Sequence, residues 1–151
     1  MKIMFINYGL GMGGAEVIAA NYLSKMKEKG LDVCLLELMH YPTFLYRKLV
    51  KEHVPIYSVL HNNENLLFKV INKFFGRKIS LGKIPRIIDE VKPDVIHLQM
   101  YSELFDLEEY GLNKVFLTIH SDLNRYLRPL CKYGKKKLHT MMQKGMHVIV
   151  L

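Results

Sequence analysis

Apolar segments alternate with amphipathic segments along this chain. Short apolar runs, typical of buried strands, recur at residues 2–7, 31–38, 54–59, 95–98, 114–119 and 147–151. Between them, apolar residues return every three or four positions, which predicts helices over 14–29, 42–52, 67–74 and 84–91 and a longer one ending near Lys144. Strands that alternate with helices indicate β-α-β units with right-handed crossovers. We therefore expect an α/β fold: a Rossmann-like, doubly wound parallel sheet of about six strands with helices on both faces.

Four glycines fill the turn between the first predicted strand and the first predicted helix: Gly9, Gly11, Gly13 and Gly14. Glycine lets backbone N–H groups approach a ligand closely, and the N-terminus of a helix favours an anion. The turn is therefore a candidate phosphate site. Gly9, Gly11 and Gly14 also match the G-x-G-x-x-G pattern of dinucleotide-binding proteins. A tight turn without a ligand would need the same residues.

The 151 residues suffice for one domain, and their net charge of +8 predicts an anionic partner such as a phosphate-bearing substrate or an acidic lipid. We find no apolar run long enough to span a membrane and no signal-peptide pattern. We expect a soluble, cytoplasmic protein. The basic residues are not interleaved with aromatic ones, so no nucleic-acid partner is expected.

Two histidines follow predicted strands, at the edge where doubly wound sheets bind their ligands. His120 could exchange a proton or hydrogen bond with a sugar or phosphate oxygen, or it could cap the next helix. His97 occupies the equivalent position one strand earlier and could simply line the crevice. Glu16, in the first turn of the first helix, could bind substrate hydroxyls or only complement the helix N-terminus. The histidines and cysteines show no metal-ligand spacing, so no metal is expected.

Two basic clusters could rest on an anionic membrane: Lys69, Lys73 and Arg77, and Lys135, Lys136 and Lys137. The same pattern arises when the apolar side of a helix packs on the sheet and its lysines face water. Both interpretations stay open, and with them a peripheral location at the inner face of the membrane.

Three motifs together resemble the N-terminal domain of the retaining glycosyltransferases of family four, which have the GT-B fold. They are Gly13-Gly14-Ala15-Glu16 after the first strand, Lys92-Pro93-Asp94-Val95-Ile96-His97 at the fourth, and Thr118-Ile119-His120 at the fifth. The resemblance covers the whole chain. Many members have a second histidine two residues after the position of His97, where this chain has Gln99.

This resemblance implies that a sugar moves from a nucleotide-diphosphate sugar to a glycan or lipid-linked acceptor, as in polysaccharide biosynthesis, without a metal or other cofactor. Carried over to this chain, it places Gly13 and Gly14 against the donor phosphates and gives His120 the catalytic role. It assigns the acceptor contacts to Glu16, His97 and Ser121. The amides and the histidine would stabilise charge that moves onto the departing diphosphate.

The resemblance also implies that residues 1–151 form the acceptor-side half of a two-domain enzyme. The nucleotide-sugar domain of such an enzyme carries a Glu-x7-Glu motif, a spacing that no two glutamates of this chain have. That domain would have to be supplied in the same chain or by another one. By itself, the half described by this sequence is expected to bind weakly and to transfer no sugar.

The sequence leaves two other functions open. A nicotinamide-binding Rossmann protein would use Gly9, Gly11 and Gly14, with Glu37 about 20 residues further on as the ribose-binding carboxylate. A non-catalytic, membrane-associated partner subunit would use the basic clusters instead.

Overall fold

Among the residues that the computed structural model describes, six parallel strands form one sheet in the order β3-β2-β1-β4-β5-β6. The structure describes residues 1–61, 66–99, 107–120, 130 and 132–150, with the backbone alone for 66–75, 77 and 78. The strands are β1 (Lys2–Asn7), β2 (Asp32–His40), β3 (Ile56–His61), β4 (Val95–Leu98), β5 (Val115–Ile119) and β6 (His147–Val150). This arrangement confirms the predicted Rossmann-like α/β class.

The helices between the strands are α1 (Gly14–Glu28), α2 (Phe44–Lys51), α3 (Leu66–Val91) and α5 (Lys132–Gln143), with the short 3-10 turns η1 (Glu108–Tyr110) and η2 (Leu112–Lys114) before β5. The helix expected from residue 42 begins at Phe44 instead, because the Thr43 side chain caps it by accepting a hydrogen bond from Tyr46 N. The strand expected at 54–59 is shifted to Ile56–His61, after Pro55.

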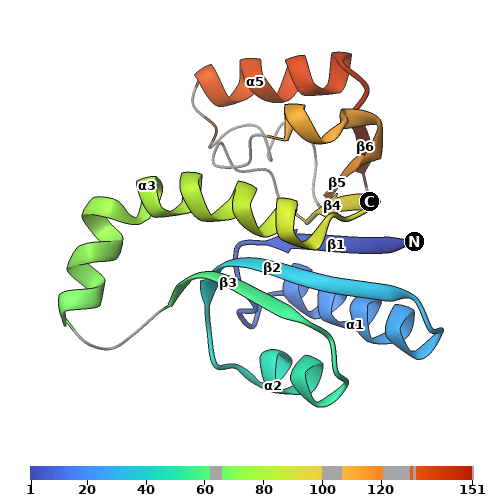
Figure 1. The fold of residues 1–151 in the computed structure, drawn as a ribbon, viewed down its shortest axis with the longest axis vertical. Coiled ribbons are helices and arrows are strands. Elements are labelled where there is room, and N and C mark those ends of the chain that lie inside the picture. The colour runs from blue at the N-terminus through green and yellow to red at the C-terminus, as the bar shows by residue number, and fades with distance from the viewer. Residues whose placement is uncertain (62–65, 100–106, 121–129, 131, 151) are drawn as a thin grey trace.

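The two helices expected at 67–74 and 84–91 are one helix, α3, which runs across the sheet and changes direction along its length (Figure 1). The intervening Gly76 and Gly82 each weaken a helix by roughly 1 kcal/mol, which is why the pattern reads as a break. Ile84 and Ile88 are almost fully buried against the sheet. Burial of such side chains contributes roughly 1.5–3 kcal/mol each, enough to offset the weak positions.

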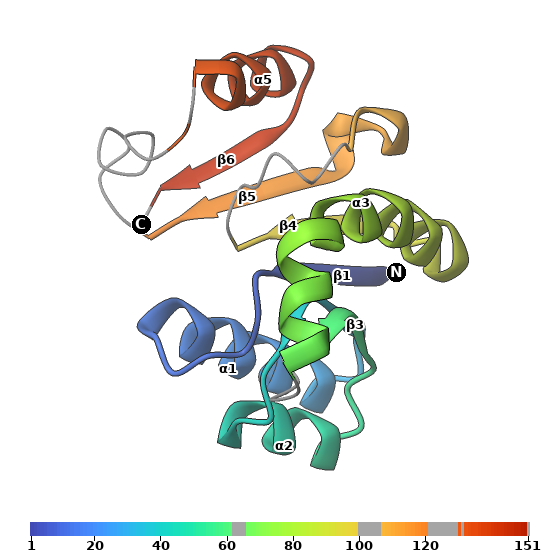
Figure 2. The ribbon, with the colours of Figure 1, turned by 90° about the vertical axis from the view of Figure 1, so that its left-hand side faces the viewer.

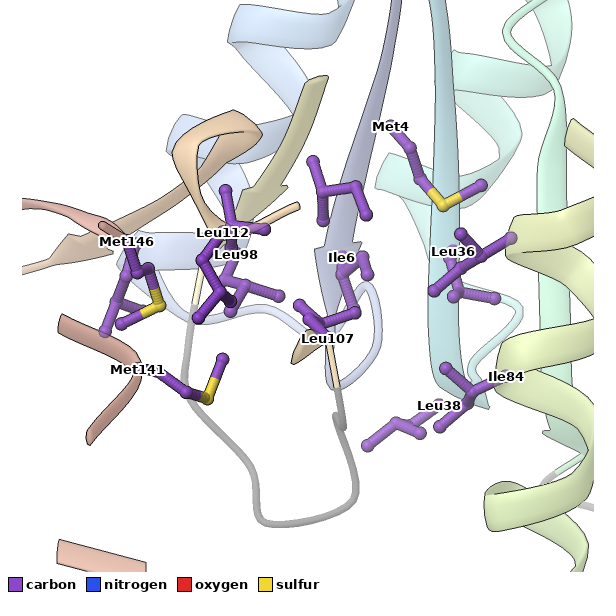
Figure 3. Packing of buried hydrophobic residues seen from close by; sticks show 14 of the residues in the cluster. Met4, Ile6, Leu36, Leu38, Ile84, Leu98, Leu107, Leu112, Met141 and Met146 are labelled. Atoms are coloured by element: carbon purple, nitrogen blue, oxygen red, sulfur yellow. The ribbon is translucent and has the colours of Figure 1, made fainter. Parts of the chain in front are cut away.

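Both faces of the sheet carry a hydrophobic core. On the face covered by α1 and α2, the buried side chains are Ile3, Phe5, Val33, Leu35, Ala20, Leu23, Leu45 and Leu49. On the face covered by α3 and α5, they include Met4, Ile6, Leu36, Leu98, Ile84, Ile88, Leu138 and Met141 (Figure 3). Alternate residues of β1 thus enter opposite cores, which explains why the strand is apolar almost throughout.

The strand order reverses between β1 and β4. The chain leaves β1 toward β2 on one side, while β4 pairs with the other side of β1. The turn after β1, Gln99 after β4 and His120 after β5 therefore lie at one edge of the sheet, the side to which the arrowheads of β5 and β6 point (Figure 2). In open α/β sheets this is where ligands bind.

Candidate functional site

The glycine loop, residues 8–13, is fixed against the end of β2. Met39 N donates to Tyr8 O at 2.7 Å, and Thr43 Oγ1 donates to Leu10 O at 2.6 Å. A Cβ atom on Gly9 would overlap Met39 O and lie 2.8 Å from the Tyr41 ring. Gly9 is therefore required for packing, whatever the loop binds.

Glu16 lies over the other end of the loop. A Cβ atom on Gly13 would overlap the Glu16 carboxylate, and one on Gly11 would lie 3.8 Å from Glu16 Oε1. Gly13 is the N-cap of α1 and offers no side chain to the free N–H groups of the first turn. The carboxylate thus sits where the helix dipole favours an anion, so an anionic ligand at Gly13 and Gly14 would share that position with it.

His120 and Gln99 meet across the ends of β5 and β4. His120 Nε2 lies 2.9 Å from Gln99 Oε1. Gln99 is 4% exposed, and its main-chain N donates to Ile6 O at 3.0 Å. The His120 ring is therefore held at the carboxyl-end edge of the sheet by a buried partner.

Two side-chain amide nitrogens are buried in this region, one of Asn7 and one of Gln99 itself. Asn7 Nδ2 and Gln99 Nε2 are shielded from solvent and have no hydrogen-bond partner among the described residues. Asn7 Oδ1 accepts from Tyr8 N at 2.8 Å, at the start of the glycine loop. A buried donor without a hydrogen bond costs roughly 1–3 kcal/mol of stability. Such donors are typical of sites where a polar ligand or an ordered water supplies the missing acceptor.

His97 has a different environment, on the sheet rather than at its edge. Its Nε2 lies 2.7 Å from Thr118 Oγ1, and its ring packs against Phe5 with centroids 4.6 Å apart. Burial, followed by the charge of His120, lowers the pKa of His97 to about 4. His97 is therefore neutral near pH 7. It also lines an apolar cavity of about 270 Å³ with Phe116 and Ile149.

Some predicted residues lie outside the described part of the chain. They are Ser121 and the side chains of Lys69, Lys73 and Arg77. Lys135 and Lys136 are exposed on α5, a helix without an acidic residue, whereas Lys137 is partly buried. No helix among the described residues is long and apolar enough to cross a membrane. Within the same residues, no three His, Cys, Asp or Glu side chains gather as a metal site would require.

Glu37 is poorly placed for the ribose of a nicotinamide nucleotide. It is fully buried three residues before β2 ends, and its Oε1 accepts from Ser58 Oγ at 2.7 Å and from His40 Nδ1 at 2.8 Å. A ribose-binding carboxylate has to be accessible at the edge of the sheet. The geometry therefore disfavours the nicotinamide-binding alternative.

Three polar residues of this region have no role predicted from the sequence: Asn7, Gln99, which stands two residues after His97, and Thr118, which belongs to the Thr118-Ile119-His120 motif. Each is buried at or near the carboxyl end of a strand that is otherwise mostly apolar. That position was a usable signal, because a polar side chain at the end of a buried strand needs a partner there. Their hydrogen bonds, however, depend on cross-strand register, which the sequence alone does not give.

Comparison with known proteins places this arrangement in a structural context. No model of a protein family matches the sequence, and no curated protein sequence matches it significantly. Among solved structures, a glycosyltransferase from Rickettsia africae ESF-5 aligns with 99% of this chain and 36% of its own, with a TM-score of 0.64 and 17% identity. Anabaena HepE, solved in complex with UDP and glucose, aligns with 100% of this chain and 44% of its own, with a TM-score of 0.57 and 12% identity.

The chain thus spans less than half the length of either glycosyltransferase. Likeness at these identities concerns the fold. The chain has the Rossmann-like α/β fold of one part of these two glycosyltransferases.

Proposed function

We propose that this chain is the acceptor-side domain of a glycosyltransferase that moves a sugar from a nucleotide-diphosphate sugar to a glycan or lipid-linked acceptor. The observation that carries the proposal is the meeting of the glycine loop and the His120–Gln99 pair at one edge of the sheet. The fold shared with two glycosyltransferases, one of them solved with UDP and glucose, supports it.

The reaction asks for stabilisation of negative charge on the departing diphosphate. Backbone N–H groups at Gly13 and Gly14 and the positive end of α1 can supply this from fixed positions. His120 then lies beside the transferred sugar, where its imidazole can bind a hydroxyl or a phosphate oxygen. This division of roles needs no metal.

The acceptor is assigned to the other side of the loop. The Glu16 carboxylate, folded over Gly11 and Gly13, can accept hydrogen bonds from acceptor hydroxyls, with Ser121 as a further contact. His97, which is held on the sheet by its hydrogen bond to Thr118, is a further residue of the acceptor side. The opposite wall of the cleft belongs to a nucleotide-sugar domain, so we expect the chain to bind a donor weakly and to transfer no sugar alone.

Saturation-transfer NMR on the purified chain tests the proposal, because it detects weak ligands. UDP-glucose and NADH would be compared at equal concentration. We expect saturation to reach the uridine and glucose protons of UDP-glucose and not the nicotinamide protons of NADH. Transfer to NADH in preference to UDP-glucose, or transfer to neither, would overturn the proposal.

A further inference from the structure

We propose that Gln99 is a positioning residue that fixes the tautomer of His120. It keeps the hydrogen of the neutral imidazole on Nε2, so that Nδ1 presents its lone pair. The use made of that lone pair rests on the proposed function. The tautomer itself does not, and it can be tested in the chain alone.

The first argument is the stiffness of the support. Gln99 follows β4 directly. Its main-chain N donates to Ile6 O of β1, the strand that pairs with β4. Its side chain is almost completely buried. A buried glutamine on an anchored main chain has few rotamers left, so its Oε1 is a fixed acceptor for the His120 ring.

The second argument is the chemistry of the 2.9 Å contact between His120 Nε2 and Gln99 Oε1. The amide presents its oxygen to the ring in this orientation, and because an amide oxygen accepts hydrogen bonds and cannot donate them, Nε2 carries the hydrogen. A neutral imidazole has one N–H, which leaves Nδ1 as an acceptor. A substrate hydroxyl can then donate to Nδ1, and after protonation of the ring the same atom can donate to a phosphate oxygen.

The third argument is that the neighbouring polar group is already engaged. Thr118 lies on β5, two residues before His120, and its hydroxyl is bonded to His97 Nε2 at 2.7 Å. The two histidines therefore use different partners. His97 of β4 pairs with Thr118 of β5, and Gln99 after β4 pairs with His120 after β5. Within the described part of the chain, the His120 ring has its hydrogen bond to Gln99.

The test is 15N NMR of histidine-labelled protein at a pH where the rings are neutral, with His120 assigned from a His120→Gln variant. We expect the wild-type chain to show the Nε2–H tautomer of His120, with an N–H signal protected from exchange with water. Gln99→Leu should abolish that protection and lower the ratio of the Nε2–H to the Nδ1–H tautomer ~5-fold, the effect of one ordinary hydrogen bond.

Two further variants separate positioning from general damage to the fold. Gln99→Glu retains an acceptor oxygen and should retain the Nε2–H tautomer and its protected signal. Thr118→Val removes the partner of His97 and should change the His97 signals while leaving the His120 tautomer as it is.

A dominant Nδ1–H tautomer in the wild-type chain would overturn the inference. So would an unchanged His120 signal in a folded Gln99→Leu chain, or, if that variant does not fold, loss of the protected signal in Gln99→Glu. These results are independent of UDP-glucose binding. The proposed function can fail while the tautomer is confirmed. Equally, the tautomer can be wrong while UDP-glucose binding is observed.

Discussion

At the scale of single residues, the two histidines show how position on one sheet produces two different environments. His97 is packed on Phe5 and bonded to Thr118, whereas His120 is held by Gln99 at the carboxyl-end edge of the sheet. The sequence places both residues at the ends of neighbouring strands, which is correct to within two residues. It does not distinguish them, because burial and hydrogen-bond partners arise only from the packing of β1, β4 and β5.

The lowered pKa of His97 predicts a dependence of stability on pH. Between about pH 6.5 and pH 4 the unfolded chain binds a proton that the folded chain does not, so the free energy of unfolding falls as the pH falls through this window. The contribution of this one group has a slope of at most about 1.4 kcal/mol per pH unit. Urea unfolding at several pH values should show a shallower dependence for His97→Gln than for the wild-type chain. Equal slopes would contradict the assignment.

The Glu16 carboxylate at the start of α1 predicts a gain in affinity for anions when it is neutralised. Glu16→Gln removes a negative charge from the helix N-terminus, where such charges are worth about 0.3–1 kcal/mol, so UDP should bind roughly two- to fivefold more tightly. The matched control is Glu28→Gln at the opposite end of α1, which changes the net charge equally. An NMR titration that gives both variants the same gain would show that only net charge matters.

At the scale of elements, periodicity predicts most strands and helices, because apolar residues fill the strands and recur every three or four positions in the helices. Burial is greatest in β1, β2 and β5, whereas the edge strand β6 is largely exposed. Periodicity predicts two helices where α3 is one, because packing on the sheet overrides its two weak glycine positions. It also places the start of α2 too early, because the Thr43 side-chain cap sets that start. The glycine loop was recognised as a loop. The separate tasks of its glycines depend on contacts with β2 and with Glu16, which are distant from the loop pattern itself.

Two glycine substitutions test this division of tasks. A side chain at Gly9 would overlap Met39 O and the Tyr41 ring, so Gly9→Ala should lower the free energy of unfolding by about 1–3 kcal/mol. Gly14 is the first residue of α1 and has no atom within 4 Å of its missing Cβ, so Gly14→Ala should be neutral or stabilising by up to about 1 kcal/mol. Urea unfolding of both variants checks this order, and a Gly9→Ala chain as stable as the wild type would refute it.

At the scale of the whole molecule, the reversal of strand order explains why distant motifs lie at one edge of the sheet. The turn after β1 and the residues after β4 and β5 are more than 100 residues apart in sequence at the extremes, yet parallel strands bring their ends to one edge. This placement follows from the alternation of strands and helices and was predictable. The buried polar residues Asn7 and Gln99 behind that edge were not, because their significance depends on which strands are neighbours.

The central claim is that this edge binds a nucleotide-diphosphate sugar. Its most direct test is a 15N–1H spectrum of the chain titrated with UDP-glucose. We predict that the largest shifts fall on the amides of Gly11, Gly13 and Gly14 and on His120, with little change at the opposite edge of the sheet, for example at Gly30. Saturating shifts confined to other parts of the chain, or no shifts at the glycine loop, would contradict the account.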